Sequence, residues 1–322
     1  MMYVEMPDRY AGRESNSERA TSPFIFHKGM SLSKLYSAER RMKKNDIMTE
    51  LLGPHRIDGF QLDILHTIHH YACLNSFVLR RLLWNTYNDR NFDNAINGLV
   101  KRGLLMRRHI FWDNGRTPYI YTVPGDLAEH FIGEGYTTNS IKETAEDYAK
   151  LIARNQFLAA IVCRDYYDSD DTKTYTMFGK QKVPLGMSVI IKGSESDMAF
   201  GKDYIRLIPV VVRRCEDWET RAETDMIKAL CYKDKLTSSY AVYVCEDDDQ
   251  KKILGKIIQN CPSLRTRTIL CCDDYTNRRN WNLACGLEAY WEAQSSGEAQ
   301  VWKKWPIYNT GGRRNERIAE LS

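Results

Sequence analysis

The sequence predicts an α+β protein in which an N-terminal winged helix-turn-helix precedes an α/β domain with a mixed sheet. Residues 55–123 show three helix patterns and then two strand patterns, the order that a winged helix has. Strand and helix patterns alternate in the C-terminal half. The length of 322 residues allows about two hydrophobic cores. The expected parts are a partly flexible arm at 1–54, a winged-helix domain at 55–135, an α/β domain at 136–295 and a basic, aromatic tail at 296–322.

Apolar residues at helical spacing predict the first two helices. The first helix is marked by Phe60, Leu62, Ile64, Leu65 and Ile68. The second, Ser76–Trp84, follows Asn75, a residue type that caps helix N-termini well. Its apolar residues are Phe77, Leu79, Leu82 and Leu83.

The third helix is expected from Asp89 to Arg102, where Gly103 favours the left-handed turn that ends helices. One apolar stripe at i, i+4, i+7 and i+8 is expected to be buried; it consists of Phe92, Ile96, Leu99 and Val100. Two strand-like runs follow, Leu104–Trp112 and Pro118–Val123. The Asp113-Asn114-Gly115-Arg116 segment between them predicts a hairpin, the wing.

A polar face of the third helix carries amides and cations. Asparagine is a mediocre helix former, so three asparagines in this short segment lower helix stability unless their side chains serve another purpose. Asn pairs bidentately with adenine and Arg with guanine at major-groove base edges. A merely solvated helix face is the alternative interpretation. The residues expected to read bases are Arg90, Asn91, Asn94 and Asn97.

Positive charge is concentrated around this helix. Residues 80–116 hold eight Lys/Arg and three Asp, a net charge of +5, whereas the whole chain has +4. Such a patch is typical of a surface that meets DNA phosphates. The expected phosphate contacts are Arg80, Arg81, Lys101, Arg107, Arg108 and Arg116.

Composition excludes several other classes of protein. With 43% hydrophobic and 27% charged residues, and no run of 18 apolar residues, the chain is expected to be cytoplasmic and not to enter a membrane. Its first 22 residues mix acids and bases, unlike a signal peptide. The nine cysteines are an odd number without a C-x-x-C pair, so reduced thiols are expected, and neither a metal nor a cofactor.

The C-terminal half is expected to alternate between strands and helices. A long helix from Ser140 to Ile161 precedes it, and an acidic loop is expected at 168–173. Pro209 interrupts a strongly apolar strand pattern and predicts a bulge or an edge strand there. The expected strands are 175–178, 186–192, 204–214, 240–245 and 266–272, and the expected helices are 218–232, 248–260 and 279–294.

A winged helix followed by a small α/β domain resembles the replication-relaxation family. The resemblance rests on Ser196–Phe200, Leu207–Arg213, the Lys228 and Tyr232 pair, and Tyr240–Cys245. It implies a DNA-binding protein of a plasmid, conjugative element or phage. It also implies that the second domain is similar to a degenerate PD-(D/E)XK nuclease, a restriction-endonuclease-like fold.

The residues needed for cleavage are incomplete. Metal-dependent phosphodiester hydrolysis needs at least two converging oxygen ligands. Asp197 offers one, but valines 210–212 occupy the strand where a second is expected, and Glu216 and Asp217 follow that strand. The chain is therefore expected not to be an enzyme; the alternative is a metal-dependent endonuclease or nickase with Asp197 and either Glu216 or Asp217 as ligands. His66, His69 and His70 have metal-pair spacing, yet packing or phosphate contact is the favoured interpretation.

Together these patterns predict a sequence-specific protein that binds double-stranded DNA and serves replication, conjugative transfer or transcription control of a mobile element. A homodimer is the expected assembly, and it would place two recognition helices about 34 Å apart on a palindromic site. Replication or transfer proteins are possible further partners. The remaining alternative is an interaction adaptor whose winged helix binds protein instead of DNA.

Overall fold

The computed structural model describes residues 30–33, 57–112, 115–117, 119–128, 144–162, 167–178, 180–192, 204–214, 217–231, 238–261, 264, 268–272, 288–291 and 301–304. The chain divides into two compact units, Met1–Ala159 and Ala160–Ser322. This border falls inside helix α8 (Ala145–Val162), later than the expected border at 135/136. Helices and a mixed sheet are both present, as the α+β prediction required.

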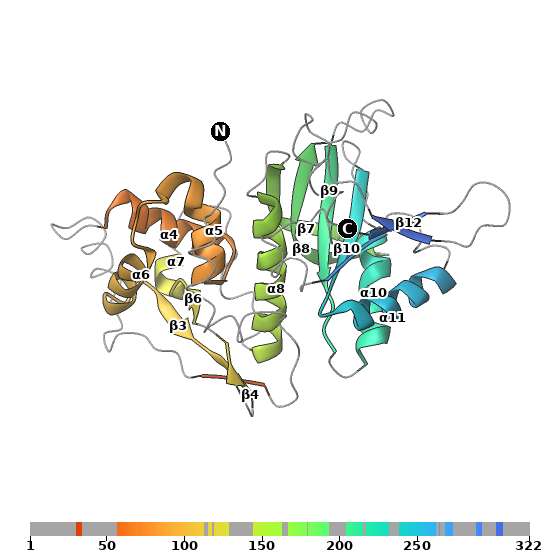
Figure 1. Ribbon diagram of the computed structural model, residues 1–322, viewed down its shortest axis with the longest axis horizontal. Coiled ribbons are helices and arrows are strands. Elements are labelled where there is room, and N and C mark those ends of the chain that lie inside the picture. Colours follow the sequence, from red (N-terminus) through yellow and green to blue (C-terminus); the bar gives the residue numbers. More distant parts are fainter. Residues whose placement is uncertain are drawn as a thin grey trace, which may run out of the picture. The chain divides into compact units, whose positions relative to one another are not determined.

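The N-terminal unit has helices, then a hairpin, in the predicted order (Figure 1). Its elements are β1 (Ser31–Leu32), α4 (Gly59–His70), β2 (Leu74–Asn75), α5 (Ser76–Tyr87), α6 (Phe92–Lys101), β3 (Met106–Arg108), β4 (Ile110–Trp112), β5 (Gly115–Arg116), β6 (Ile120–Thr122) and α7 (Gly125–Ala128). Strands β2, β6 and β3 form one antiparallel sheet in that order, and β1, β4 and β5 form another.

Side-chain caps fix where the three helices start. Asp58 and Gln61 form a reciprocal capping box at α4, and Asn75 caps α5 by accepting from the Val78 N–H. Asn91 caps α6 in the same way, through the Asn94 N–H at 3.1 Å. Helix α6 therefore begins at Phe92, later than the expected Asp89. It ends as predicted, since Gly103 has a φ of 74°.

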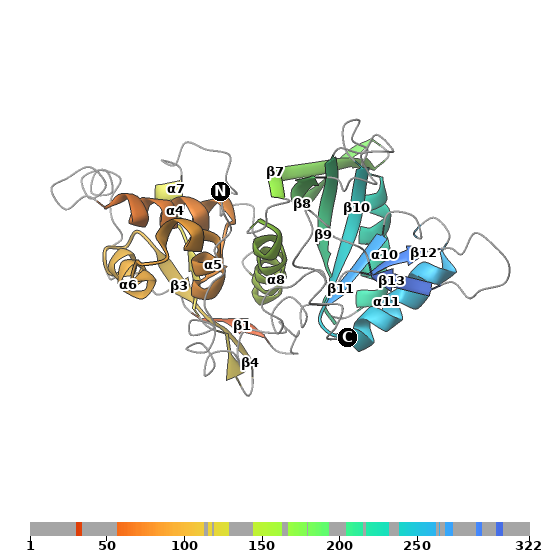
Figure 2. The same ribbon diagram turned by 45° about the horizontal axis from the view of Figure 1, so that its top comes forward.

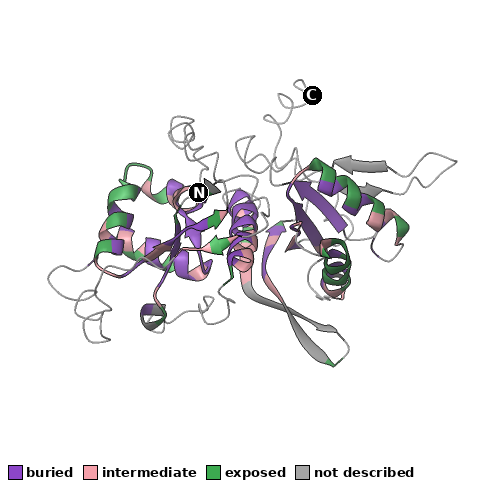
Figure 3. Ribbon diagram, turned by 90° about the horizontal axis from the view of Figure 1, so that it is seen from below, coloured by how far each residue is buried: buried purple, intermediate pink, exposed green. Residues whose placement is uncertain are grey.

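The predicted apolar stripe of α6 is buried. Phe92, Ile96, Leu99 and Val100 are each at most 2% exposed, and Figure 3 shows buried residues on the inner sides of these helices. The Phe60 ring of α4 meets the Phe92 ring edge-on at 4.9 Å, which seats α6 against α4. Leu62 departs from the predicted core of α4, because it is 36% exposed.

Part of the expected arm belongs to the folded unit. Strand β1 pairs with β4, with Ser31 opposite Phe111 and Leu32 opposite Ile110. Ser33 then donates its N–H to the His109 carbonyl, and its hydroxyl accepts from the His109 N–H, both at 2.9 Å. The hairpin is thereby widened to three strands. The Asp113-Asn114 part of its turn lies outside the described residues.

Helix α8 is tied to the N-terminal unit by a buried amide. Asn155 is fully buried and donates to the Tyr71 carbonyl at 2.9 Å and to the Cys73 carbonyl at 2.7 Å. Between these two carbonyls, Ala72 has a φ of 65°, a left-handed conformation that is strained for alanine. The Asn155 amide therefore bridges both sides of the tight turn that leads from α4 into β2.

The C-terminal unit contains a seven-stranded mixed sheet in the order β13-β12-β11-β10-β9-β8-β7. Strands β9, β10 and β11 are parallel, and the other pairs are antiparallel (Figure 2). The elements are β7 (Tyr167–Phe178), β8 (Gln181–Lys192), β9 (Tyr204–Val211), α10 (Trp218–Leu230), β10 (Ser238–Cys245), α11 (Asp248–Asn260), β11 (Thr268–Cys272), β12 (Glu288–Trp291) and β13 (Val301–Lys304).

Three expectations for this unit were wrong, each because strand pairing prevails over local sequence. The expected acidic loop 168–173 is part of β7, which pairs with β8. The expected helix 279–294 contains a strand, β12. The expected tail supplies β13, which pairs with β12 at the sheet edge. At Pro209 a bulge or an edge was expected, and the edge alternative fits better: Pro209 pairs with Val242 of β10 but lies beyond Leu207, the last β9 residue paired with β8, so its missing N–H is tolerated.

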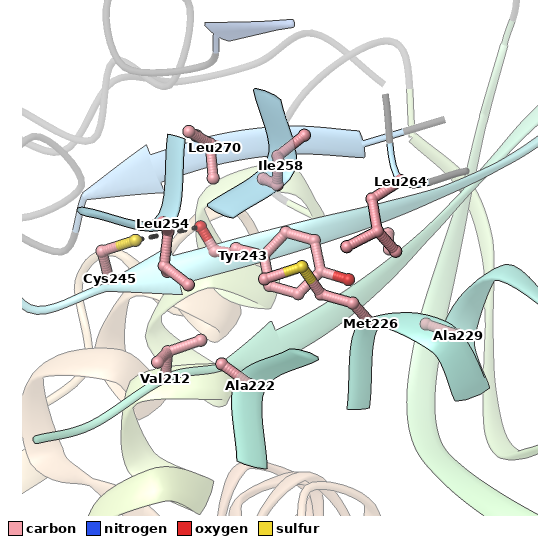
Figure 4. Close-up of a cluster of buried hydrophobic side chains, with 11 residues drawn as sticks. Val212, Ala222, Met226, Ala229, Tyr243, Cys245, Leu254, Ile258, Leu264 and Leu270 are labelled. Carbon is pink, nitrogen blue, oxygen red and sulfur yellow. Dashed lines mark hydrogen bonds between the residues drawn. The ribbon is translucent and has the colours of Figure 1, made fainter. Parts of the chain in front are cut away.

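Helices α10 and α11 pack on one face of this sheet through a shared apolar cluster (Figure 4). At its centre the fully buried Tyr243 ring of β10 lies among Met226, Ile258 and Leu264. Within the described part of the chain, its hydroxyl has no hydrogen-bond partner. Burial raises the pKa of this phenol well above its ordinary value, so it stays neutral.

Candidate nucleic-acid interface

The outer face of α6 carries the side chains that were expected to read bases. Asn94 and Asn97 are exposed, and Lys101 is exposed one turn further along, opposite the buried apolar stripe. Amides that are solvated in this way are free of the core and retain donors and acceptors for a ligand. Asp93 shares this surface, and its side chain is 69% exposed.

Two of the four expected base-reading residues precede the helix instead of lying along it. Asn91 is exposed, but its side-chain oxygen is engaged in the α6 cap. Arg90 is exposed, with its guanidinium carbon 6.0 Å from the centre of the Phe60 ring. Both residues stand at the N-terminal end of α6, where recognition helices direct side chains to bases.

Arg80 is committed to a contact within the protein. Its guanidinium donates to the Asp93 carboxylate at 3.1 Å and lies 5.7 Å from the centre of the Phe92 ring. Its side chain is only 12% exposed. The prediction that Arg80 contacts phosphate is therefore wrong. Arg80 instead neutralises Asp93 on the candidate interface and joins α5 to α6.

Arg81 and Arg108 are also poor candidates for phosphate contact. They are 5% and 4% exposed, and a phosphate needs an accessible guanidinium. Arg81 follows Val78 by three residues and therefore shares the buried face of α5. Arg108 stacks 4.9 Å from the Tyr148 ring of α8. Both expected phosphate contacts are therefore replaced by structural roles.

The hairpin supplies the remaining cations. Arg116 on β5 is exposed and stands opposite Phe111 of β4. Arg107 on β3 is half-buried, with its guanidinium 4.5 Å from the centre of the Tyr119 ring. With Lys101, these two arginines make up the accessible part of the six-residue set expected to contact phosphate.

The structure adds aromatic residues that the sequence analysis did not single out. Tyr119 is 38% exposed and stacks on His109 at 4.0 Å, with 30° between the ring planes. Phe111 is 36% exposed and lies 5.7 Å from the same His109 ring. The signal available in the sequence was the alternation of basic and aromatic residues from Arg107 to Tyr121.

Charged residues of the C-terminal unit form an ion-pair cluster after strands β9 and β10. Arg214 contacts Asp247 through two hydrogen bonds of 2.5 Å and contacts the fully buried Glu246 at 3.3 Å. Hydrogen bonding to Asp247 raises the pKa of Arg214, and the same bonds lower the pKa of Asp247. Asp247 also caps α11 by accepting from the Gln250 N–H. These acids are thus engaged in structural contacts.

The possible ligands of a nuclease centre are not brought together within the described part of the chain. Asp197 and Glu216 lie outside the described residues, as does Tyr232. Asp217 is exposed, with a φ of 55°, at the start of α10. Among the residues that the structure describes, no group of three or more His, Cys, Asp or Glu side chains is arranged to hold a metal ion.

The histidine group of α4 is partly withdrawn from solvent. His69 is 6% exposed, and its pKa is lowered by burial first and then by the neighbouring His66 and His70. A lowered pKa keeps the His69 imidazole neutral near pH 7, so electrostatic contact with a phosphate is not favoured there.

Comparisons of the chain with protein-family models, curated proteins and solved structures found no match. In the described parts of the chain, every helix is too short or too polar to span a lipid bilayer.

Proposed function

We propose that the N-terminal unit is a winged-helix domain that binds double-stranded DNA with sequence preference. The proposal is supported by the order α4, β2, α5, α6 and hairpin, and by the small antiparallel sheet β2-β6-β3 that closes it. In this arrangement α6 would be the recognition helix, placed in the major groove, and the hairpin would be the wing.

The observation that carries the proposal is the two-sided character of α6. One side is a buried apolar stripe, and the other presents exposed Asn94, Asn97 and Lys101. An α-helix fits the major groove, and asparagine is the side chain that pairs bidentately with adenine there. Asn94 and Asn97, which lie within the helix, would then be retained for recognition despite their poor helix propensity.

The structure-based contact set is smaller than the one expected from sequence. Asn94 and Asn97 would read bases, and Arg90 and Asn91 would approach them from the start of α6. Lys101, Arg107 and Arg116 would hold phosphates, because their charges lie on exposed or half-buried residues. Phosphate contacts set the register and base contacts the preference, so the two groups give different mutant phenotypes.

The broader role is a proposal of the same kind. The protein would act as a homodimer in replication, transfer or transcription of a mobile element. Its C-terminal unit would be a non-catalytic scaffold, which is what the resemblance to the replication-relaxation family implies. Sedimentation with and without DNA tests the dimer, and a monomer alone in both conditions would contradict the homodimer.

Incubation with supercoiled plasmid and Mg²⁺ or Mn²⁺ tests catalysis. Nicks that disappear in Asp197→Ala would show that the C-terminal unit is a nuclease and not a scaffold.

The deciding experiment is selection of bound duplexes from a random library, followed by binding measurements on the selected sequence. Asn94→Ala is expected to relax base preference at one position by about 1–3 kcal/mol. Asn260→Ala, at an exposed asparagine at the end of α11, is the matched control and should leave preference unchanged. Selection without any enriched sequence, or an Asn94→Ala protein with wild-type preference, would contradict the proposal.

A further inference from the structure

The hairpin carries a continuous row of rings and guanidinium groups that a phosphate-binding wing does not require. Arg107 lies over Tyr119 at 4.5 Å, and Tyr119 stacks on His109 at 4.0 Å. His109 in turn meets the edge of the Phe111 ring at 5.7 Å, and Phe111 stands opposite Arg116. The row therefore places three consecutive rings between two guanidinium groups and ends in the exposed Arg116.

Hydrogen bonds within the unit hold the centre of this row in place. His109 is 9% exposed, and its Nδ1 lies 2.6 Å from the Thr117 carbonyl oxygen. The His109 N–H donates to the Ser33 hydroxyl, while the Thr117 hydroxyl accepts from the Ile110 N–H. The fixed imidazole covers one face of Tyr119 and Arg107 lies over the ring, so a base that stacks on Tyr119 takes the place of the guanidinium on the other face.

The two rings that flank His109 are partly open to solvent. Phe111 and Tyr119 are 36% and 38% exposed. Phe111 and Arg116 lie on the β4–β5 pair, Arg107 lies on β3 of the other small sheet, and Tyr119 directly precedes β6. Apolar side chains of another protein would gain little from two guanidinium groups at this position. Unpaired nucleic acid matches it better, because bases stack on aromatic faces while phosphates attract arginine.

We propose that Phe111 and Tyr119 stack on unpaired bases beside the duplex that α6 engages, with Arg116 and Arg107 holding the adjoining phosphates. This inference rests on the proposed function and extends it from duplex DNA to duplex with an exposed single-stranded stretch. Such DNA is then the preferred ligand of the full chain. Aromatic stacking tolerates any base, so the preference concerns strand structure and not base sequence.

The test compares the affinity of the full-length protein for an intact duplex with its affinity for the same duplex carrying a short single-stranded gap. Wild-type protein should bind the gapped form more tightly, and Phe111→Ala or Tyr119→Ala should each lose about tenfold on gapped DNA only. Tyr204→Ala is the matched control, because Tyr204 is also exposed, at 41%, on β9. 2-Aminopurine in the gap should be quenched by wild-type protein and by Tyr119→Phe, but not by Tyr119→Ala.

The outcomes separate this inference from the proposed function. Sequence-selective duplex binding without a gap preference would overturn the inference and leave the function standing. Gap binding that depends on Phe111, without any duplex binding, would overturn the proposed function and leave only the stacking of unpaired bases on the hairpin. If Phe111→Ala changes the sedimentation coefficient of the protein but not its affinity for gapped DNA, the row is a contact between two copies of the chain, and the inference is overturned. Phe111→Tyr retains the ring, so loss of gap preference in that folded variant also counts against stacking.

Discussion

The salt dependence of DNA binding gives the sharpest test of which cations meet phosphate. Charge counting along the sequence gives six contacts. Burial of Arg81 and Arg108, and the pairing of Arg80 with Asp93, reduce this set by half. The informative perturbation is Arg116→Gln, which removes a charge from an exposed hairpin position whose backbone pairing does not depend on the side chain.

Counterion release converts the number of contacts into a slope. Each neutralised phosphate contributes about −0.9 to the slope of log affinity against log salt, so three contacts give about −2.7. Raising salt from about 50 to about 200 mM should then weaken wild-type binding about 40-fold, whereas six contacts would weaken it about 1,800-fold. Arg116→Gln should lower the slope to about −1.8 and the same loss to about 12-fold.

Fluorescence anisotropy on a duplex with a single site measures this slope, and sedimentation gives the number of chains on each duplex, so that the slope is expressed per chain. Lys252→Gln is the control, because Lys252 is 71% exposed on α11 and paired with Asp249, outside the proposed interface. A wild-type slope near −5 would show that more cations meet phosphate than this reasoning allows. An unchanged slope in Arg116→Gln would remove the hairpin from the contact set.

Three further predictions concern stability, measured by urea unfolding with DNA absent. Asn155→Ala removes the amide donor shared by the Tyr71 and Cys73 carbonyls, of which the Tyr71 carbonyl still accepts from the Cys73 N–H, so it should lower the unfolding free energy by about 1–3 kcal/mol; a change below about 0.5 kcal/mol would contradict the bridging role of Asn155. Tyr243→Phe removes a buried hydroxyl that has no partner among the described residues, so stability should hold or rise by about 1 kcal/mol, and a clear loss would reveal a partner. The pKa of Asp247 is lowered by its hydrogen bonds from Arg214, so its stabilisation is present above about pH 4 and is lost as pH falls through the lowered pKa. The stability difference between wild type and Asp247→Asn should therefore shrink under acid, and a constant difference would refute the pairing.

The sequence correctly predicted those features of the fold that depend only on neighbouring residues in the chain. The apolar stripe of α6 and the left-handed Gly103 follow from helical periodicity and from the steric freedom of glycine, and both were confirmed. Asn75 was expected to open the second helix and does cap it. The bounds of α11, Asp248–Asn260, are those expected from its acidic start and apolar spacing.

Contacts between distant residues account for most of what the sequence did not predict. The short β12 strand depends on pairing with β11 and β13, which no local pattern encodes. The acidic residues at the start of β7 have low strand propensity, yet Asp170 and Asp171 are held there opposite Val189 and Ser188 of β8. Tertiary pairing outweighs a propensity difference of about 1 kcal/mol per residue.

The roles of the arginines at the candidate interface were also difficult to predict from the sequence alone. A count of charges treats every arginine alike, although the environment of each guanidinium decides its role. Arg81 could have been assigned to the core, because it continues the spacing of Val78 and Trp84 on one side of α5. Arg108 could not, since its contact with Tyr148 depends on the packing of a helix that is distant in sequence.

The Arg80–Asp93 pair accounts for an acid on the side of α6 that we propose contacts DNA. Asp93 lies in the first turn of the helix, where a negative charge is stabilised by the helix dipole, and α6 gains stability that Asn94 and Asn97 do not provide. An isolated carboxylate at this exposed position would repel phosphates. Because Arg80 lies 3.1 Å from Asp93 and is largely buried against α6, it offsets that repulsion without needing a phosphate of its own. Arg80 is thus not expected to contact phosphate itself, but by neutralising Asp93 it favours the proposed contact of this surface with DNA.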